Sequence, residues 1–130
     1  MCGIAGYLGE IPNSNNSLFE MIDAINHRGP DNHGIWFDEN AGIGFAHSRL
    51  SIIDLSPAGH QPIHSVSNNL VMIFNGEIYN HNSIRSELEK ISNRNWHGHS
   101  DTETLLAAIE EWGLDNALRK TKGMFALALW

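Results

Sequence analysis

The single cysteine of the chain is its second residue, in the opening segment MCGIAGYLGE. Removal of the initiator Met1 would leave Cys2 with a thiol and a free α-amine on one residue. A thiolate is the nucleophile in cysteine chemistry, and a terminal amine with a pKa of about 8 can accept the thiol proton near neutral pH. Cys2 is therefore a candidate nucleophile that needs no separate histidine. The alternative is a small apolar residue in the first strand, because free cysteines are often buried.

The segment FNGEIYN, residues 74–80, places Asn75 and Gly76 directly after an apolar run. An Asn-Gly pair is typical of a tight hairpin turn with positive φ. The same pair could stabilise an oxyanion, because a side-chain amide and a backbone N–H are the donors that such a site uses. The two interpretations are compatible, and the pair is a candidate oxyanion hole.

Three charged residues could hold an amino acid by its α-substituents. Arg49 follows an apolar run, and its planar guanidinium suits bidentate binding of a carboxylate, although a pair with Asp54 is the simpler explanation. Asp101 could bind an α-ammonium group with Glu77 near it. The simpler explanation for Asp101 is the helix dipole, which favours an acidic residue in the first turn of a helix.

Two further segments are rich in turn-forming residues. HRGPDNHG, residues 27–34, predicts a loop in which Arg28 and Asp31 could pair with each other. LSPAGHQP, residues 55–62, predicts a loop that could shape the mouth of a pocket, and we assign no chemistry to His60.

Strands are predicted where apolar runs rich in branched and aromatic residues occur. These runs are CGIAGYLG, which fits a buried first strand, then IWF, IGFAHSRLSII, LVMIF and the closing GMFALALW. Because the last run has no polar close, we expect the chain to be a fragment of a longer protein.

Helices are predicted where apolar residues recur at helical spacing, over residues 17–26, around 84–91 and over 100–113. The first has a capping-box pattern at Ser17 and Glu20, and the third has one at Ser100 and Glu103 with Gly113 at its stop. The second follows cap candidates in residues 80–83. Periodicity alone predicts only that strands and helices occur together.

The composition predicts one globular domain over residues 1–130, with 42% hydrophobic and 18% charged residues. A net charge of −7 with only eight Lys and Arg argues against binding to nucleic acid or to an anionic membrane. With no signal peptide or spanning segment, a cytoplasmic protein is expected. One cysteine forms no internal disulfide, and His97 with His99 is only a weak metal signal, so no metal site is expected.

Six segments in order resemble the class II glutamine amidotransferase domain of glutamine-hydrolysing asparagine synthetases, within the N-terminal nucleophile hydrolase superfamily. The segments are MCGIAGY, HRGPD, SRLSIIDLSPAGHQP, FNGEIYN, HSDTETLL and GMFALALW. The resemblance covers nearly the whole chain. It implies an α+β fold, a four-layer αββα sandwich truncated at its C-terminus, with two largely antiparallel sheets face to face and helices outside.

The resemblance also implies a role for each candidate residue. Cys2 would attack the side-chain amide of L-glutamine to form a thioester, and Asn75 with Gly76 would hold the oxyanion. The other implied substrate contacts are the Arg49 guanidinium on the carboxylate, the pocket-lining backbone of Leu50, Ser51, Ile52 and Ile53, and Glu77 with Asp101 on the amino group.

The family's synthetase half binds ATP through a glycine-rich motif, and this chain has no adjacent pair of glycines. We therefore expect no cofactor in this domain, with ATP and Mg²⁺ confined to an absent synthetase domain in cis. The ammonia acceptor, aspartate or another carboxylate, and the oligomeric state, with a homodimer among the options, stay open. The rival functions are a glutamine-binding protein without hydrolysis, for example one that retains Met1, and a thiol redox sensor.

Overall fold

The computed structural model describes residues 2–9, 14–51 and 57–130. Its strands are β1 (Gly3–Leu8), β2 (Asn32–Asp38), β3 (Ile43–Arg49), β4 (Ile63–His64), β5 (Val71–Ile78) and β6 (Gly123–Leu129). Its helices are α1 (Ser14–Ile25), α2 (His81–Ile91), α3 (Asp101–Trp112) and α4 (Leu114–Lys120), with short 3₁₀ turns at Asn26–Arg28 and Pro57–Gly59. None of these helices is long and apolar enough to cross a membrane.

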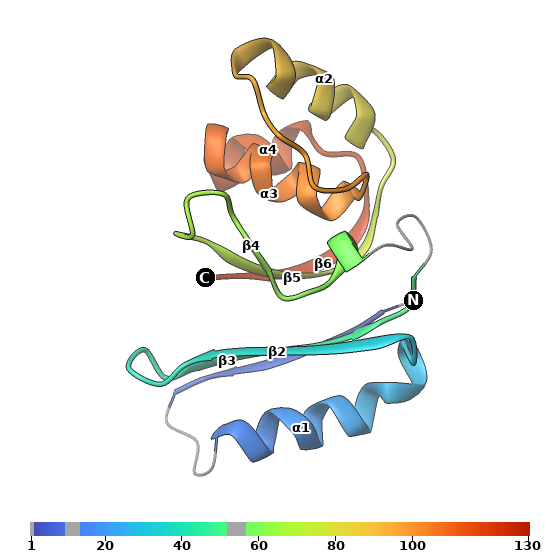
Figure 1. Ribbon diagram of the computed structural model, residues 1–130, viewed down its shortest axis with the longest axis vertical. Coiled ribbons are helices and arrows are strands. Elements are labelled where there is room, and N and C mark those ends of the chain that lie inside the picture. Colours follow the sequence, from blue (N-terminus) through green and yellow to red (C-terminus); the bar gives the residue numbers. More distant parts are fainter. Residues whose placement is uncertain (1, 10–13, 52–56) are drawn as a thin grey trace.

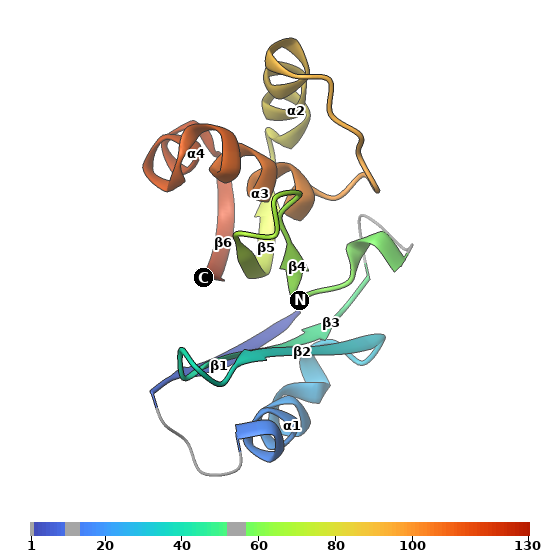
Figure 2. The same ribbon diagram turned by 60° about the vertical axis from the view of Figure 1, so that its left-hand side comes forward.

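The strands form two antiparallel sheets of three strands each, ordered β1-β3-β2 and β4-β5-β6. The sheets face each other, with α1 on the outer side of the first sheet and α2, α3 and α4 on the outer side of the second (Figures 1 and 2). Two small antiparallel sheets with four helices, in the part of the chain described, confirm the predicted α+β class.

Alternation along each strand builds three apolar layers. On β3, Phe45 turns toward the second sheet and packs with Ile73, while Ala46 turns the other way onto Leu18 of α1. The largest layer lies between the second sheet and its helices. Its buried residues are Met72, Phe74, Ile78, Ile84, Leu88, Leu105, Leu106, Ala108, Ile109 and Ala117.

The helix predictions are confirmed in position, with corrections at their ends. The helix predicted over 17–26 begins at Ser14, so Ser17 lies inside α1 rather than at its N-cap. Ser100 caps α3 as predicted, accepting the Glu103 N–H at 3.1 Å. The reciprocal half of the capping box is absent there, because the Glu103 carboxylate accepts the N–H groups of His97 and Gly98 instead.

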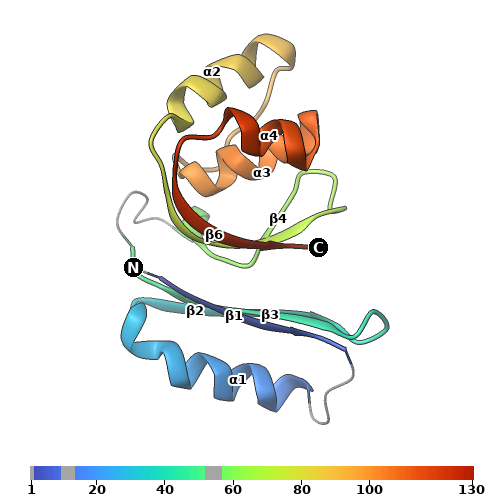
Figure 3. The same ribbon diagram turned by 180° about the vertical axis from the view of Figure 1, so that it is seen from behind.

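Two strand predictions are wrong in detail. β1 is an edge strand rather than a buried one, and Leu8 is 75% exposed. Asn75 and Gly76 lie inside β5 and pair with Ala126 and Phe125 of β6, so no hairpin turn forms at this Asn-Gly pair. Both edges formed by β1 and β6 lie on the same side of the molecule (Figure 3).

Candidate active site

A cavity of about 180 Å³ lies where the ends of β3 and β5 meet the start of α3. Its lining includes eight of the predicted site residues: Cys2, Arg49, Leu50, Ser51, Asn75, Gly76, Glu77 and Asp101. The structure therefore brings together residues that are up to 99 positions apart in the sequence. The predicted Ile52 and Ile53, and also Met1 and Asp54, lie outside the described residues.

Cys2 lies just before β1, at the end of the ladder that pairs β1 with β3. The Leu50 N–H donates to the Cys2 sulfur at 3.3 Å, and the sulfur lies 3.5 Å from the Leu50 carbonyl oxygen. Both contacts hold the thiol at the rim of the cavity, where it is only partly buried. This position contradicts the alternative in which Cys2 is a core residue of the first strand.

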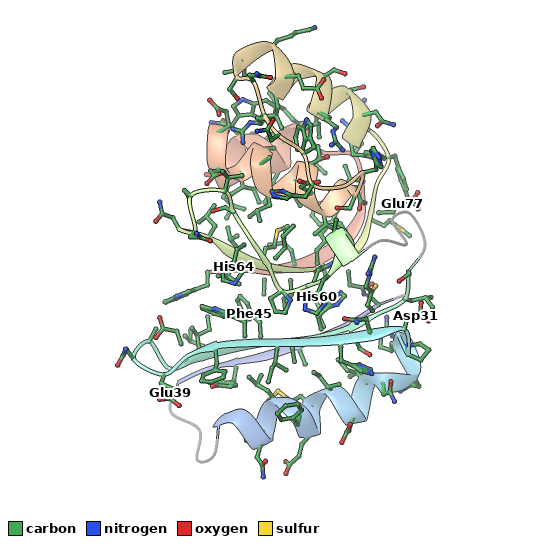
Figure 4. All side chains as sticks on the ribbon, viewed as in Figure 1. Asp31, Glu39, Phe45, His60, His64 and Glu77 are labelled. Carbon is green, nitrogen blue, oxygen red and sulfur yellow. The ribbon has the colours of Figure 1, made fainter. Side chains whose placement is uncertain are left out.

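The HRGPD segment supports the same end of the site. Arg28 donates from Nε to the Cys2 carbonyl oxygen at 3.1 Å, and Asp31 Oδ2 accepts the Ser51 N–H at 2.8 Å. Arg28 and Asp31 thus hold two pocket segments rather than pairing with each other, which corrects the simpler prediction. β2 begins at Asn32, so the predicted loop ends earlier than its composition indicates. Figure 4 places Asp31 and Glu77 at the same end of the molecule.

Arg49 ends β3 and is 8% exposed. Strand alternation turns it toward the second sheet, as it does Phe45. The absence of a side chain at Gly59 makes room for its guanidinium, since a Cβ atom there would collide with it. Arg49 thus presents a buried positive charge to the cavity from the first sheet.

Asn75 and Gly76 approach the cavity from the second sheet. Alternation along β5 turns Asn75 to the same side as Ile73, which faces the first sheet. Gly76 has φ +155°, and a Cβ atom there would collide with Met124 and Phe125 of β6. Glycine is therefore required by close approach between strands, and not by a turn.

Backbone alternation also defines where the Gly76 N–H points. Val71 and Tyr79 both hydrogen-bond to the β6 side, so the odd-numbered N–H groups of β5 face β6. Even-numbered groups face the other side. There, Phe74 N donates to Gln61 Oε1 and Ile78 N donates to Asp101 Oδ2. The Gly76 N–H lies between these two bonds, beyond the end of β4 and beside the cavity.

Asp101 has a structural role at this edge. Its carboxylate is 4% exposed and accepts two backbone N–H groups, from Ile78 at 2.8 Å and from Thr102 at 2.9 Å. It also lies in the first turn of α3, where the helix dipole favours a negative charge. The carboxylate therefore joins β5 to α3 and places a fixed negative charge in the cavity wall.

His47 lies next to the site and was not among the predicted site residues. It is fully buried between the sheets, and neither ring nitrogen hydrogen-bonds to a described residue. Burial lowers the pKa of His47 from 6.5 to about 4. The Phe74 backbone has a smaller effect that raises this pKa, and the charges of His60, Arg49 and His33 lower it further. His47 is therefore neutral at pH 7.

Seven lining residues were missed by the sequence analysis: Gly59, Gln61, Phe74, Tyr79, Ser100, Thr102 and Met124. Gly59 and Gln61 belong to the loop whose composition predicted a pocket mouth, so that signal was present at the level of the segment. The others are neighbours of predicted residues in β5 or α3, apart from Met124 of β6, for which the sequence offers no signal.

The cavity holds a thiol, a backbone N–H on the side of β5 that faces away from β6, a buried guanidinium and a buried carboxylate. Opposite charges at fixed positions suit a zwitterionic amino acid, and a thiol beside an N–H donor suits attack on a carbonyl group. The arrangement fits nucleophilic acyl transfer on a small amino acid derivative.

The whole chain, residues 1–130, matches the family model of the glutamine amidotransferase domain. It is 39% identical to the glutamine-hydrolyzing asparagine synthetase 1 of Bacillus subtilis, in a match covering 100% of this chain and 21% of that protein. Amidase chry2 of Gibberella zeae is 34% identical, again over 100% of this chain and 21% of the relative. The chain spans about a fifth of the length of these curated relatives.

Proposed function

The chain belongs to the glutamine amidotransferase domain family, and from this premise we propose that it hydrolyses the side-chain amide of L-glutamine to glutamate and ammonia. The observation that supports this most is that Cys2, Arg49, Gly76 and Asp101 line one cavity. Each of the four supplies a different group that the reaction needs.

In the first step, the α-amine of Cys2, freed by removal of Met1, takes the thiol proton. The thiolate sulfur forms a bond to the side-chain amide carbon of glutamine, and the carbonyl π electrons move to the oxygen. The Gly76 N–H, which points away from β6 at the cavity, and the Asn75 amide would hold this oxyanion. The Leu50 N–H, 3.3 Å from the sulfur, stabilises the thiolate.

In the second step, the oxyanion collapses and the carbon–nitrogen bond breaks, while the Cys2 ammonium returns its proton to the leaving nitrogen. Ammonia departs and a thioester remains. A water molecule then adds to the thioester carbon, the carbon–sulfur bond breaks, and glutamate leaves with the thiol restored.

Substrate length follows from the two fixed charges. Arg49 would bind the α-carboxylate, and Asp101 with the exposed Glu77 would bind the α-ammonium group. The pocket backbone at Leu50 and Ser51 would line the substrate. Because the head group is held at a fixed distance from the sulfur, asparagine, which is one methylene shorter, would react far more slowly.

The ammonia would serve an amidation of the asparagine synthetase type, in a synthetase domain in cis that uses ATP and Mg²⁺. This rests on the names of the curated relatives and on their length, about five times that of the chain. The facing sheets and outer helices support the four-layer sandwich of the N-terminal nucleophile hydrolases as the complete fold.

Glutamine turnover by variants of Cys2 tests the proposal, after intact-mass measurement has established that Met1 is removed. We expect Cys2→Ala to abolish ammonia release and Cys2→Ser to retain a low rate, since a hydroxyl is a weaker nucleophile at the same position. Full turnover by Cys2→Ala would exclude the mechanism. Glutamine binding with no turnover by the Met1-free protein would instead support the rival binding function.

A further inference from the structure

Gln61 links the two sheets at the end where the cavity lies. Its side chain is buried, with 6% of the residue exposed, and Oε1 accepts the Phe74 N–H of β5 at 2.6 Å. Its backbone carbonyl lies against Gly34 of β2, where a Cβ atom would collide with it. His60, the preceding residue, places Nδ1 2.7 Å from Asn32 Oδ1 at the start of β2. Figure 4 shows His60 between the two sheets.

The β4–β5 ladder explains why a side chain makes this contact. β4 pairs Ile63 with Met72 and His64 with Val71, so Gln61 would stand opposite Phe74 if the strand continued. An ordinary antiparallel ladder would join them through the Gln61 backbone carbonyl. That carbonyl instead packs against the first sheet. The oxygen of the Gln61 side-chain amide therefore accepts the Phe74 N–H in its place.

The side-chain hydrogen bond from Gln61 to Phe74 affects the residue two positions further along β5. The N–H groups of Phe74 and Ile78 are tied to Gln61 and Asp101 on the side away from β6. Gly76 lies between them, and its φ of +155° is a conformation that only glycine adopts without strain. Two side-chain bonds therefore fix the strand on both sides of the Gly76 N–H.

We propose that Gln61 is a positioning residue that sets the direction of the Gly76 N–H. It packs against the first sheet through its backbone carbonyl, and its side chain holds the Phe74 N–H of β5 in place. The inference rests on the proposed function, in which the Gly76 N–H binds the oxyanion. Gln61 does not touch the substrate in this proposal. It acts through β5, and a donor turned slightly away from the oxyanion lowers the rate of reaction more than the affinity for glutamine.

A pair of variants separates this role from a general loss of packing. Gln61→Met keeps the length and the unbranched shape of the side chain but has no strong acceptor. Gln61→Glu keeps an oxygen at the same position in either protonation state. We expect Gln61→Met to lower kcat for glutamine hydrolysis about tenfold or more, with KM within about twofold. Gln61→Glu should restore most of the kcat.

Amide hydrogen exchange supplies a readout that does not depend on activity. In Gln61→Met the Phe74 N–H should exchange at least about tenfold faster than in the wild-type chain, while in Gln61→Glu it should stay protected. Unchanged protection of the Phe74 N–H in Gln61→Met would overturn the positioning role of Gln61. An equal loss of kcat in both variants would also overturn it. If the Met variant does not fold, Gln61→Asn, with its amide drawn back by one methylene, gives the same two readouts.

The two proposals fail in different ways. If the wild-type chain, shown to lack Met1, hydrolyses no glutamine, the proposed function is wrong, and the exchange of Phe74 still decides whether Gln61 holds β5. If the wild-type chain hydrolyses glutamine and Gln61→Met does so at the same kcat and KM, the positioning role is wrong and the proposed function stands.

Discussion

The guanidinium of Arg49 fills the space left by the missing side chain of Gly59. In the proposed function, both its planar shape and its positive charge serve to bind the α-carboxylate of glutamine. We expect Arg49→Lys to raise KM for glutamine by about tenfold or more, because an ammonium group cannot bind a carboxylate through two parallel N–H donors. Since the contact is made in the ground state and in the transition state alike, kcat should change much less. Steady-state kinetics checks this, and a lower kcat at unchanged KM would contradict it.

Protonation of His47 is a second property of a single residue. Its folded pKa of about 4 lies below the unfolded value of 6.5, so the unfolded chain binds more protons as the pH falls between these values. Stability is therefore full above pH 6.5 and is lost on acidification, by about 2 kcal/mol between pH 7 and pH 5.

The control for this effect is His47→Leu, which removes the titrating group. Urea unfolding of both proteins at pH 7 and pH 5 gives the two differences in unfolding free energy. The drop in the wild-type chain should exceed that in the variant by about 2 kcal/mol. Equal drops would mean that His47 does not titrate between its two states in this range.

At this scale the sequence predicted the chemistry better than the contacts. The thiol of Cys2 and the charges of Arg49 and Asp101 could be identified because few residue types perform such roles. The support given by Arg28 to the Cys2 carbonyl and by Asp31 to the Ser51 N–H could not, because it joins segments more than 19 residues apart. Their sequence proximity suggested only a pair with each other.

Helix α3 is the element on which the carboxylate of Asp101 depends. Ser100→Ala removes the acceptor for the Glu103 N–H and should lower the unfolding free energy by about 1 kcal/mol. Denaturant unfolding measures the change. Ser86→Ala, on the exposed face of α2, is the matched control and should leave stability nearly unchanged or slightly higher, since alanine favours a helix interior. An equal effect of both variants would contradict the capping role.

Helices and strands were predicted well where the spacing of apolar residues reflects burial. They were predicted poorly where contact with a segment distant in the sequence determines the local conformation. The faces of α1, α2 and α3 follow from apolar spacing, because α1 and α3 each bury one side against a sheet and α2 buries one side against α3. The Asn-Gly pair misled because its glycine serves the close approach of β6, a strand about 50 residues later. α4 was missed because seven residues are too few for a helical period to emerge.

At the scale of the whole molecule, the relation between the two sheets was expected only through the family resemblance. Single-sequence patterns give strands and helices, but they do not say which strand edges remain unpaired. In the described residues, β1 and β6 are such edges, and they lie on one side of the molecule beside a cavity of about 560 Å³ (Figure 3). Apolar residues line most of that cavity, among them Ile43, Phe45, Leu129 and Trp130.

The edge strand β6 is apolar along its whole length, and its first four residues, from Gly123 to Ala126, are exposed. An exposed, uncharged edge offers unpaired backbone groups to another strand. We therefore expect the 130-residue chain to associate as its concentration rises, which sedimentation velocity would detect. Ala126→Lys should weaken this association, because a charge on an edge strand opposes pairing. Ala24→Lys, on the exposed face of α1, adds the same charge elsewhere and should leave association unchanged. Equal effects of both variants would mean that net charge, rather than the β6 edge, controls association.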